Sequence, residues 1–478
     1  MPQPTQAQSS NQEVLIATQL SQTIIKNVKF KELDHIITAI SAPSAQWTSN
    51  YERYEFLGDS LLKFVVSTQL YADHPNWHEG YLSIRRKGLV CNTRLAKAAV
   101  DTGLDTYILT TPLLTRKWVA PTISEMLVDS STPRELSRKI LADVVEALIG
   151  AAFIDNGLAA AQSCIHVFLP DICSNPINFQ TISRYEGKTC YGTKNLVDAE
   201  ELVGYKFRDS YIFLEAFTHP SCQRDEFTES YQRLEFLGDA VLDMIVASAL
   251  FAADANLSQG KMTQIKTALV NAQFLAYLAM QLTLTQNTVD VYEPAFGVFE
   301  EKYGTRNLHL WQFMRHESRE ITKAQQACLK RYHSLRADIH LSLSQGKTYP
   351  WVLLTRLSAD KFFSDLIEAV FGAIFIDSQG DLAECMKFAE RLGLLDYLRR
   401  IALNNDEVDV THPKNLVGHL AKSQKVNYAT GYRNDDDETG FFCKVSVGDA
   451  VIAVVGGCAP RDEAIVTAAE KTVDVLKM

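Results

Sequence analysis

The chain of 478 residues lacks the features that mark several specialised classes of protein. It has no uninterrupted run of 18 apolar residues, so we expect no membrane-spanning helix and no membrane partner. Its first residues, MPQPTQAQSSNQE, contain neither the basic nor the apolar region of a signal peptide. Its nine cysteines form no CxxC pair, which favours a reducing intracellular compartment over a disulfide framework. Cytoplasm and nucleus both fit this composition.

The chain also lacks an excess of positive charge. Lys and Arg number 47 against 57 Asp and Glu, which gives a formal net charge of −10. Because phosphate backbones are usually bound by positively charged surfaces, this balance by itself argues against a nucleic-acid partner. The total averages over the whole chain, however, and says nothing about where each charge gathers.

Glycine and proline are rare inside two long stretches with helical periodicity, which predicts a mainly α protein. After Asp406 the pattern changes to alternating runs, FFCKVSVGDAVIAVVGG, followed by a helical stretch. This order of helix, strands and helix predicts a small α+β domain. The predicted parts are a disordered tail (1–13), a helical domain (14–172), a linker (173–194), a second helical domain (195–405) and the α+β domain (411–478).

An internal repeat organises the two helical domains. Residues 51–71 align without gaps on 231–251 at an offset of 180, and ten of the 21 positions are identical. Residues 139–155 match 361–377 at an offset of 222. The offset grows by 42 between the two blocks (222 − 180), so the second copy carries an insertion of about that length between them, which we place within about 296–349.

Each copy carries four acids in otherwise apolar helical segments. The acids come in pairs spaced four and three residues apart, which places both members of a pair on one helix face. Neighbouring like charges on a buried face are costly unless a cation compensates them. The eight acids are Glu55, Asp59, Asp143, Glu146, Glu235, Asp239, Asp365 and Glu368.

A shared metal ion is the interpretation that this recurrence favours. A solvated helix face would explain any single pair, but surface acids have no physical reason to persist in both copies while neighbours such as Lys63 and Asp243 differ. Hard oxygen ligands without nearby His or Cys favour Mg²⁺ or Mn²⁺ over zinc. Four carboxylates around such an ion suit in-line hydrolysis of a phosphodiester.

Glycines stand between the two acids of the first block in each copy, at Gly58 and Gly238. Glycine costs about 1 kcal/mol inside a helix, so its presence there needs a reason. Close packing of another backbone, or of a second copy of the same segment, would supply one. Simple helix curvature is the alternative.

These segments carry a family resemblance. YERYEFLGDS and YQRLEFLGDA resemble the ribonuclease III signature, DVVEALIGAAFID and DLIEAVFGAIFID resemble its second acidic motif, and LEAFTHPSC is also typical. Two such domains followed by a small α+β domain resemble the C-terminal half of Dicer. The stretch FVVSTQLYADHPNWHEGYLS, followed by RKWVAP, is most similar to fungal Dicer-like proteins, in particular the antiviral Dicer-like protein 2 type.

The resemblance implies an endoribonuclease that cuts double-stranded RNA by two-metal hydrolysis. Its two domains would pair within one chain as a pseudo-dimer, and each would cut one strand. The products would carry 5′-phosphate and 3′-hydroxyl ends with two-nucleotide 3′ overhangs. Roles in small-RNA production, RNA silencing and antiviral defence follow by resemblance, with upstream Dicer modules or small-RNA effector proteins as candidate partners.

By motif match, the four acids of each copy would form one metal site. Lys139 and Lys361 precede the second-motif Asp by four residues, and they would contact scissile phosphates or else lie solvated on the helix. The first copy departs from the family pattern in two places. Tyr54 stands where the signature normally has Leu, a packing change, and Ala42 stands where the second copy has His219, which puts the local loop structure in question.

The tail has few basic residues where an RNA-binding domain would have them, whereas the insertion is rich in them. The tail resembles a double-stranded RNA-binding domain, yet its last helix starts APRDEAIV with only Arg461 basic, so a protein-contact or structural role is an equal alternative. Residues 302–347 hold nine Lys or Arg against three Asp or Glu. Two interpretations fit this insertion: an additional helical segment exposed to solvent, or a segment that contacts the RNA backbone.

A non-catalytic RNA-binding or scaffold protein that keeps the ribonuclease III fold is the alternative function. Loss of the metal-binding acids would favour it, and all eight acids are present. The chain has no GxxxxGK[ST] segment, so we expect no helicase of the Dicer type within it. Whether it is a whole protein or part of a larger Dicer stays open at this stage.

Overall fold

The computed structural model describes residues 11–45, 49–110, 136–172, 177, 179, 194–222, 228–295, 298–404, 407–434 and 439–477. Two compact units are distinguished, Met1–Arg184 with Phe236–Thr263 and Tyr185–Glu235 with Gln264–Met478. Residues 1–10 of the predicted tail lie outside the described residues, as does nearly all of the predicted linker. The tail prediction was wrong for residues 11–13, which begin a helix in which Glu13 is buried.

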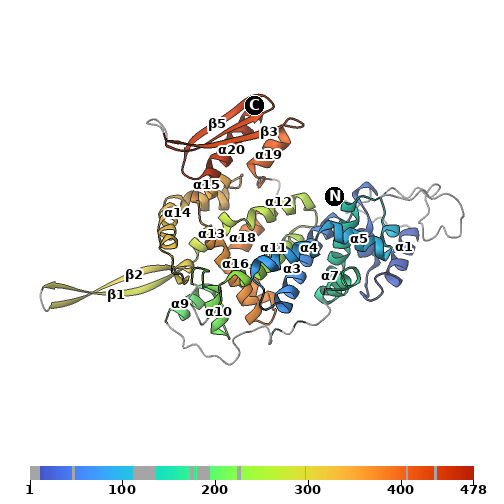
Figure 1. Cartoon of the computed structure of the whole chain (residues 1–478), viewed down its shortest axis with the longest axis horizontal. Coiled ribbons are helices and arrows are strands. Elements are labelled where there is room, and N and C mark those ends of the chain that lie inside the picture. Colours follow the sequence, from blue (N-terminus) through green and yellow to red (C-terminus); the bar gives the residue numbers. More distant parts are fainter. Residues whose placement is uncertain are drawn as a thin grey trace, which may run out of the picture. The chain divides into compact units, whose positions relative to one another are not determined.

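The first unit is helical (Figure 1). Its central element is α7, whose buried side chains contact α2, α3 and α5. Non-helical backbone at Asn156 and Gly157 interrupts α7, where Gly157 has a φ of 74°. The elements are α1 (Asn11–Gln22), α2 (Leu33–Ile40), η1 (Pro43–Ala45), α3 (Glu52–Asp73), α4 (Glu79–Leu89), α5 (Asn92–Thr102), η2 (Leu104–Tyr107) and α7 (Arg138–Phe168).

Glycine lets α3 and α7 cross at very short range. A Cβ at Gly58 would overlap the carbonyl oxygen of Glu146, and a Cβ at Gly150 would overlap that of Tyr54. The second copy repeats half of this arrangement, since a Cβ at Gly372 would overlap the carbonyl oxygen of Leu234. Close backbone packing therefore explains Gly58, and helix curvature is not needed.

The second unit contains the remaining helices and all five strands of the described residues. Helix α16 is its most buried element and packs against α10, α13 and α17. Helices α11 (Gln232–Ala253) and α12 (Gln259–Leu269) are divided between the two units. The other helices are α9 (Lys194–Val203), α10 (Ser210–Ala216), α13 (Ala272–Gln281), η3 (Leu310–Phe313), α14 (Arg319–Gln345), α15 (Trp351–Leu357), α16 (Phe362–Asp377), α17 (Leu382–Arg391) and α18 (Leu394–Leu403).

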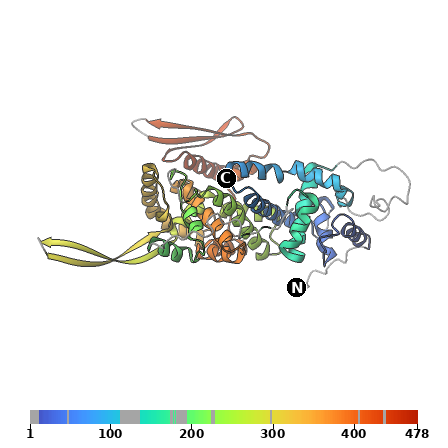
Figure 2. The ribbon, with the colours of Figure 1, turned by 60° about the horizontal axis from the view of Figure 1, so that its bottom comes forward.

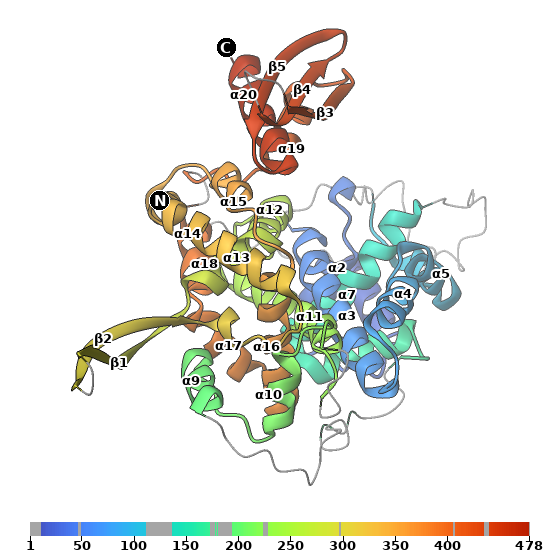
Figure 3. The ribbon, with the colours of Figure 1, turned by 60° about the vertical axis from the view of Figure 1, so that its left-hand side comes forward.

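A strand pair over residues 283–309, which begins before the predicted insertion and ends within it, corrects the prediction of an entirely helical second domain. Strands β1 (Thr283–Ala295) and β2 (Val298–His309) pair antiparallel, with Thr283 opposite His309, and form a two-stranded ribbon (Figure 3). The segment TLTQNTVDVYE is rich in β-branched residues and contains a tyrosine, residue types that favour a strand. After the ribbon, the short helix η3 and the long helix α14 have the helical structure predicted for the insertion.

The C-terminal domain confirms the predicted order of helix, strands and helix. Strands β3 (Val426–Asn434), β4 (Thr439–Val447) and β5 (Ala450–Cys458) form an antiparallel sheet with α19 (Pro413–Leu420) and α20 (Arg461–Lys477) packed against it (Figure 2). Its core includes Cys443, Val445, Ala464 and Ala468, all fully buried. A mainly helical chain with a small α+β domain, as the sequence predicted, is therefore confirmed.

Two core helices are long and apolar enough to cross a membrane, although the sequence has no uninterrupted apolar run of that length. They are α7 and α11, and 61% and 67% of their most apolar windows are buried inside the protein. Burial of this kind is the ordinary situation of a core helix, so length and hydropathy carry little weight here.

Replacing Gly58 with Ala tests the close crossing of α3 and α7. We expect Gly58→Ala to lower the free energy of unfolding by about 1–3 kcal/mol, because the helices must separate to admit the methyl group. Gly88→Ala is the matched control, since a Cβ there meets nothing within 4 Å and alanine favours the helix. Urea denaturation measures both, and equal stability of the two variants would contradict the crossing.

Candidate active site

Three carboxylates of the first copy meet where α3 crosses α7. Glu55 lies in the first turn of α3, while Asp143 and Glu146 lie on α7. Ligand oxygens of the three all lie within 4.8 Å of one another. Asp143 is only 3% exposed and Glu146 only 8% exposed, so the group is set largely into the protein.

The fourth predicted ligand, Asp59, lies one turn after Glu55 on α3 and is exposed. It is not among the carboxylates that meet within 4.8 Å. Its charge still reaches the group, because after burial it is the largest contributor to the raised pKa of Glu146. The structure therefore places Asp59 at the solvent-facing side of the cluster.

Lys139 and Tyr51 hold the acids of the first cluster. The Lys139 Nζ lies 2.6 Å from Asp143 Oδ2 and 3.6 Å from Glu55 Oε1. Tyr51 donates its hydroxyl to Asp143 Oδ2 at 3.2 Å. Burial and the neighbouring Asp143 raise the pKa of this hydroxyl, so Tyr51 remains a donor.

Two glutamates of the first cluster, Glu55 and Glu146, have raised pKa values. Burial, with the charge of Asp143, raises the pKa of Glu55 to about 7. Burial, with the charges of Asp59 and Glu55, raises the pKa of Glu146 to about 9. Lys139 alone therefore does not compensate the negative charge of the carboxylates, and the cluster favours the binding of a further cation.

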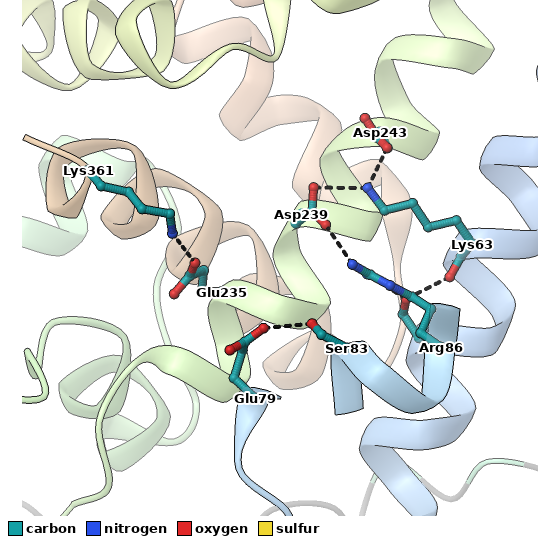
Figure 4. Close-up of polar contacts among 9 residues, drawn as sticks. Lys63, Glu79, Ser83, Arg86, Glu235, Asp239, Asp243 and Lys361 are labelled. Atoms are coloured by element: carbon teal, nitrogen blue, oxygen red, sulfur yellow. Dashed lines mark hydrogen bonds and ion pairs between the residues drawn. The ribbon is translucent and has the colours of Figure 1, made fainter. Parts of the chain in front are cut away.

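The second copy builds the same group from Glu235 on α11 and from Asp365 and Glu368 on α16. Lys361 Nζ lies 2.6 Å from both Glu235 Oε1 and Asp365 Oδ1, and Figure 4 shows its contact with Glu235. Burial and the charge of Asp365 raise the pKa of Tyr231, the counterpart of Tyr51.

Asp239, the remaining predicted ligand, has a different set of contacts. Its Oδ1 lies 2.9 Å from Lys63 Nζ, and its Oδ2 lies 3.3 Å from Arg86 (Figure 4). Asp239 is not in the group of three carboxylates. In the first unit it therefore pairs with cations from α3 and α4.

Residues that the sequence analysis did not single out shape both clusters. Tyr51 and Tyr231 occupy equivalent positions at the start of the 21-residue repeat, and Gly150 and Gly372 occupy equivalent positions in the second block. Their recurrence in both copies could have marked them as important in the sequence. Their position beside the acids could not be predicted, because it depends on how the helices cross.

The donor chemistry of both clusters fits a divalent metal ion. Each offers three carboxylates, and no His or Cys belongs to either group. Oxygen-only sites favour hard cations such as Mg²⁺ and Mn²⁺. A bound cation would also offset the burial and the mutual repulsion that together raise the pKa values of Glu55 and Glu146.

Both acid clusters lie in stretches that match a known protein family. Residues 52–157 and 232–379 match the ribonuclease III domain, and both stretches contain all four acids of their copy. Residues 406–478 match the double-stranded RNA-binding domain of Dicer-like protein 2. The chain belongs to the ribonuclease III family.

The chain is similar to fungal Dicer-like proteins over nearly its whole length. It is 48% identical to Dicer-like protein 2-1 of Aspergillus niger, over 97% of this chain and 34% of that protein. Dicer-like protein 2 of Neosartorya fischeri is also 48% identical, over 97% and 33% respectively. Dicer-like protein 2 of Cryphonectria parasitica is 36% identical, again over 97% and 33%. The chain thus spans about a third of the length of these relatives.

The raised pKa values predict how stability depends on pH without metal. Between the ordinary glutamate pKa near 4.5 and the values of about 7 for Glu55 and about 9 for Glu146, the folded chain retains protons that the unfolded chain has released. Stability in a chelator should therefore fall as pH rises through this window. Urea denaturation at several pH values measures the fall.

The double variant Glu55→Gln/Glu146→Gln should show a shallower fall, because its amides do not titrate. Glu320→Gln is the control, since that side chain is 79% exposed. The explanation fails if the double variant retains the pH dependence of the unchanged protein.

Proposed function

We propose that this chain cleaves double-stranded RNA, each of its two acid clusters hydrolysing one strand. The observation that carries the proposal is the recurrence of one three-carboxylate group, with its lysine, in both copies. Family membership and the similarity to Dicer-like proteins support it. Because the chain spans about a third of those relatives, their whole activity extends to it only as a proposal.

Divalent metal ions, Mg²⁺ or Mn²⁺, held by the carboxylates would activate water and stabilise negative charge on the phosphate. Glu55, Asp143 and Glu146 would hold the cation from two helices, with the charge of Asp59 near them at the open side. Glu235, Asp365 and Glu368 would hold it in the second cluster.

The lysine of each cluster has a second role in this proposal. Lys139 and Lys361 have side chains 69% and 70% exposed, so their ammonium groups are accessible to a ligand as well as to the acids. With cations bound to the acids, these ammonium groups would be able to contact a scissile phosphate. Two-nucleotide 3′ overhangs would follow from pairing of the two domains within one chain.

Helix α14 supports a role for the insertion in binding RNA. Its buried face includes Ile321, Cys328 and Tyr332, while Arg319, Lys323, Lys330 and Arg336 are exposed. Two other basic residues serve the fold, since Arg315 donates to Thr218 and Thr228 and Arg331 donates to the carbonyl oxygens of Leu357 and Ser358. Lys323 Nζ also lies 2.9 Å from Glu320 Oε1, so a phosphate would compete with that acid for this lysine. All four exposed side chains are accessible to a phosphate backbone.

The C-terminal domain contributes less positive charge to an RNA contact. In the first turn of α20, Glu463 accepts a hydrogen bond from Arg356 Nε of α15 at 2.6 Å. Where a basic helix start would face phosphates, this domain has an acid that fastens it to the preceding helices. We propose that it contributes mainly by docking there.

The biological setting follows from the relatives. We propose that the products enter small-RNA silencing, including antiviral defence, inside the cell. None of the seven cysteines among the described residues is in a disulfide, which suits a reducing compartment.

Separate inactivation of each cluster tests the division of labour. Glu55→Ala should leave a chain that nicks one strand of a duplex, and Glu235→Ala should leave one that nicks the other, because each removes one metal ligand. The double variant should cleave at least roughly 100-fold more slowly. Duplex RNA labelled on either strand, incubated with Mg²⁺ and resolved on denaturing gels, reports each cut.

Glu320→Gln, an exposed acid on α14, provides the control and should cut both strands. If the unchanged protein binds duplex RNA but cuts neither strand, the scaffold alternative holds instead. Cleavage that survives the double variant would also overturn the proposal.

Charge reversal on α14 tests the RNA contact. Lys323→Glu/Lys330→Glu should weaken binding of duplex RNA and reduce the dependence of binding on salt, since two phosphate contacts are lost. Fluorescence anisotropy at several salt concentrations measures both. Lys97→Glu, a 73% exposed lysine on α5, is the control, and an equal effect of both changes would exclude a specific role for α14.

A further inference from the structure

One position of the repeat has opposite charge in the two copies and contacts its own counterpart. Lys63 and Asp243 are equivalent at the offset of 180, inside a block where ten of 21 positions are identical. Lys63 Nζ lies 2.5 Å from Asp243 Oδ2 (Figure 4). A residue meets its own equivalent only near a two-fold axis, so this pair marks a pseudo-two-fold relation between α3 and α11.

This geometry has a consequence for any pairing between identical copies. If α3 paired with the α3 of another chain in the same way, Lys63 would face Lys63. If α11 paired with another α11, Asp243 would face Asp243. Only the pairing of α3 with α11 brings opposite charges together at this position.

The pair is sufficiently buried for the difference to matter. The Lys63 side chain is 23% exposed and that of Asp243 is 9% exposed. The Lys63 ammonium lies 2.9 Å from Asp239 Oδ1 as well as 2.5 Å from Asp243 Oδ2, so two carboxylates compensate its charge at this site. Two like charges at such a site are strongly unfavourable, whereas the opposite pair compensates itself.

The surrounding contacts do not distinguish the copies in this way. Arg86 contacts Asp239 and Ser67 and lies over the ring of Phe236, but its equivalent in the second copy is also basic, Lys266. Arg53 donates to the carbonyl oxygen of Phe251, and its equivalent, Arg233, is identical in type. The reversal at Lys63 and Asp243 therefore carries the distinction.

We propose that the Lys63–Asp243 pair selects the partner of each ribonuclease III copy: it directs α3 to α11 and excludes a second copy of this chain. The inference rests on the proposed pairing of the two domains within one chain and adds what makes that pairing specific. Apolar contacts between such similar segments discriminate poorly, so a repulsive element against self-pairing supplies the specificity.

Charge reversal tests the selection without RNA or metal. Lys63→Asp and Asp243→Lys each create a like-charged pair and should lower the midpoint of thermal unfolding by about 3 °C or more. The combined variant Lys63→Asp/Asp243→Lys restores an opposite pair at this position and should recover part of the loss, because the separate contact of Lys63 with Asp239 stays broken. Lys97→Asp, an exposed lysine of α5, is the matched control and should change little.

Mixing the two single variants provides the second measurement. One chain then carries Asp at both positions and the other carries Lys at both, so every favourable pair forms between chains. We expect a 1:1 heterodimer on co-expression, seen by native mass spectrometry or light scattering, whereas the unchanged protein and the combined variant remain monomeric. A single variant that does not fold alone can still form this heterodimer, because both chains are made together.

The proposal is overturned if the unfolding midpoint of the combined variant is lowered by as much as the two single losses added together. It is also overturned if the co-expressed single variants form no heterodimer. Neither readout involves cleavage. A chain that proves inactive on RNA but shows the coupling would refute the proposed function and leave this inference standing.

Discussion

The close crossing of α3 and α7 is the constraint on which the first cluster depends. Two glycines, Gly58 and Gly150, remove the side chains that would separate the helices, and the backbone of each then lies against the other. Glu55 and Glu146 are brought together by this approach. The second copy uses Gly372 against Leu234 in the same way. The carboxylate groups are thus products of helix packing, and their chemistry follows from it.

Carboxylates gathered in this way repel one another, and lysine and arginine side chains from several helices partly offset the repulsion. Lys139 and Lys361 bridge the acids within each cluster. Lys63 and Arg86 compensate Asp239. The raised pKa values of Glu55 and Glu146 show that compensation in the first cluster is incomplete without a further cation. The net charge of −10 therefore does not describe every part of the surface, since acids gather in the two clusters while four basic side chains are exposed on α14.

The sequence predicted the parts of the structure that local pattern controls. Helical periodicity, the repeat and the paired acids were sufficient for the two helical domains and for the candidate ligands, whose role in metal binding stays a prediction. The β1–β2 ribbon was missed because most of β2 is exposed, so no buried face enforced a recognisable alternation. The contacts of Asp239 with Lys63 and Arg86 depend on helices about 150 to 180 residues apart in sequence, which periodicity cannot register. Ala42 and His219 raised a question about their loops, yet each donates its backbone N–H in an equivalent bond, to Leu109 and Arg315.

The central claim is that both clusters bind divalent cations through the carboxylates that the helix crossings assemble. Titration of the metal-free chain with Mn²⁺, followed by calorimetry or electron paramagnetic resonance, measures this directly. We predict binding at both clusters, with Asp143→Asn removing one set of sites and Asp365→Asn the other. Absence of binding, or binding that both substitutions together leave unchanged, would contradict the claim.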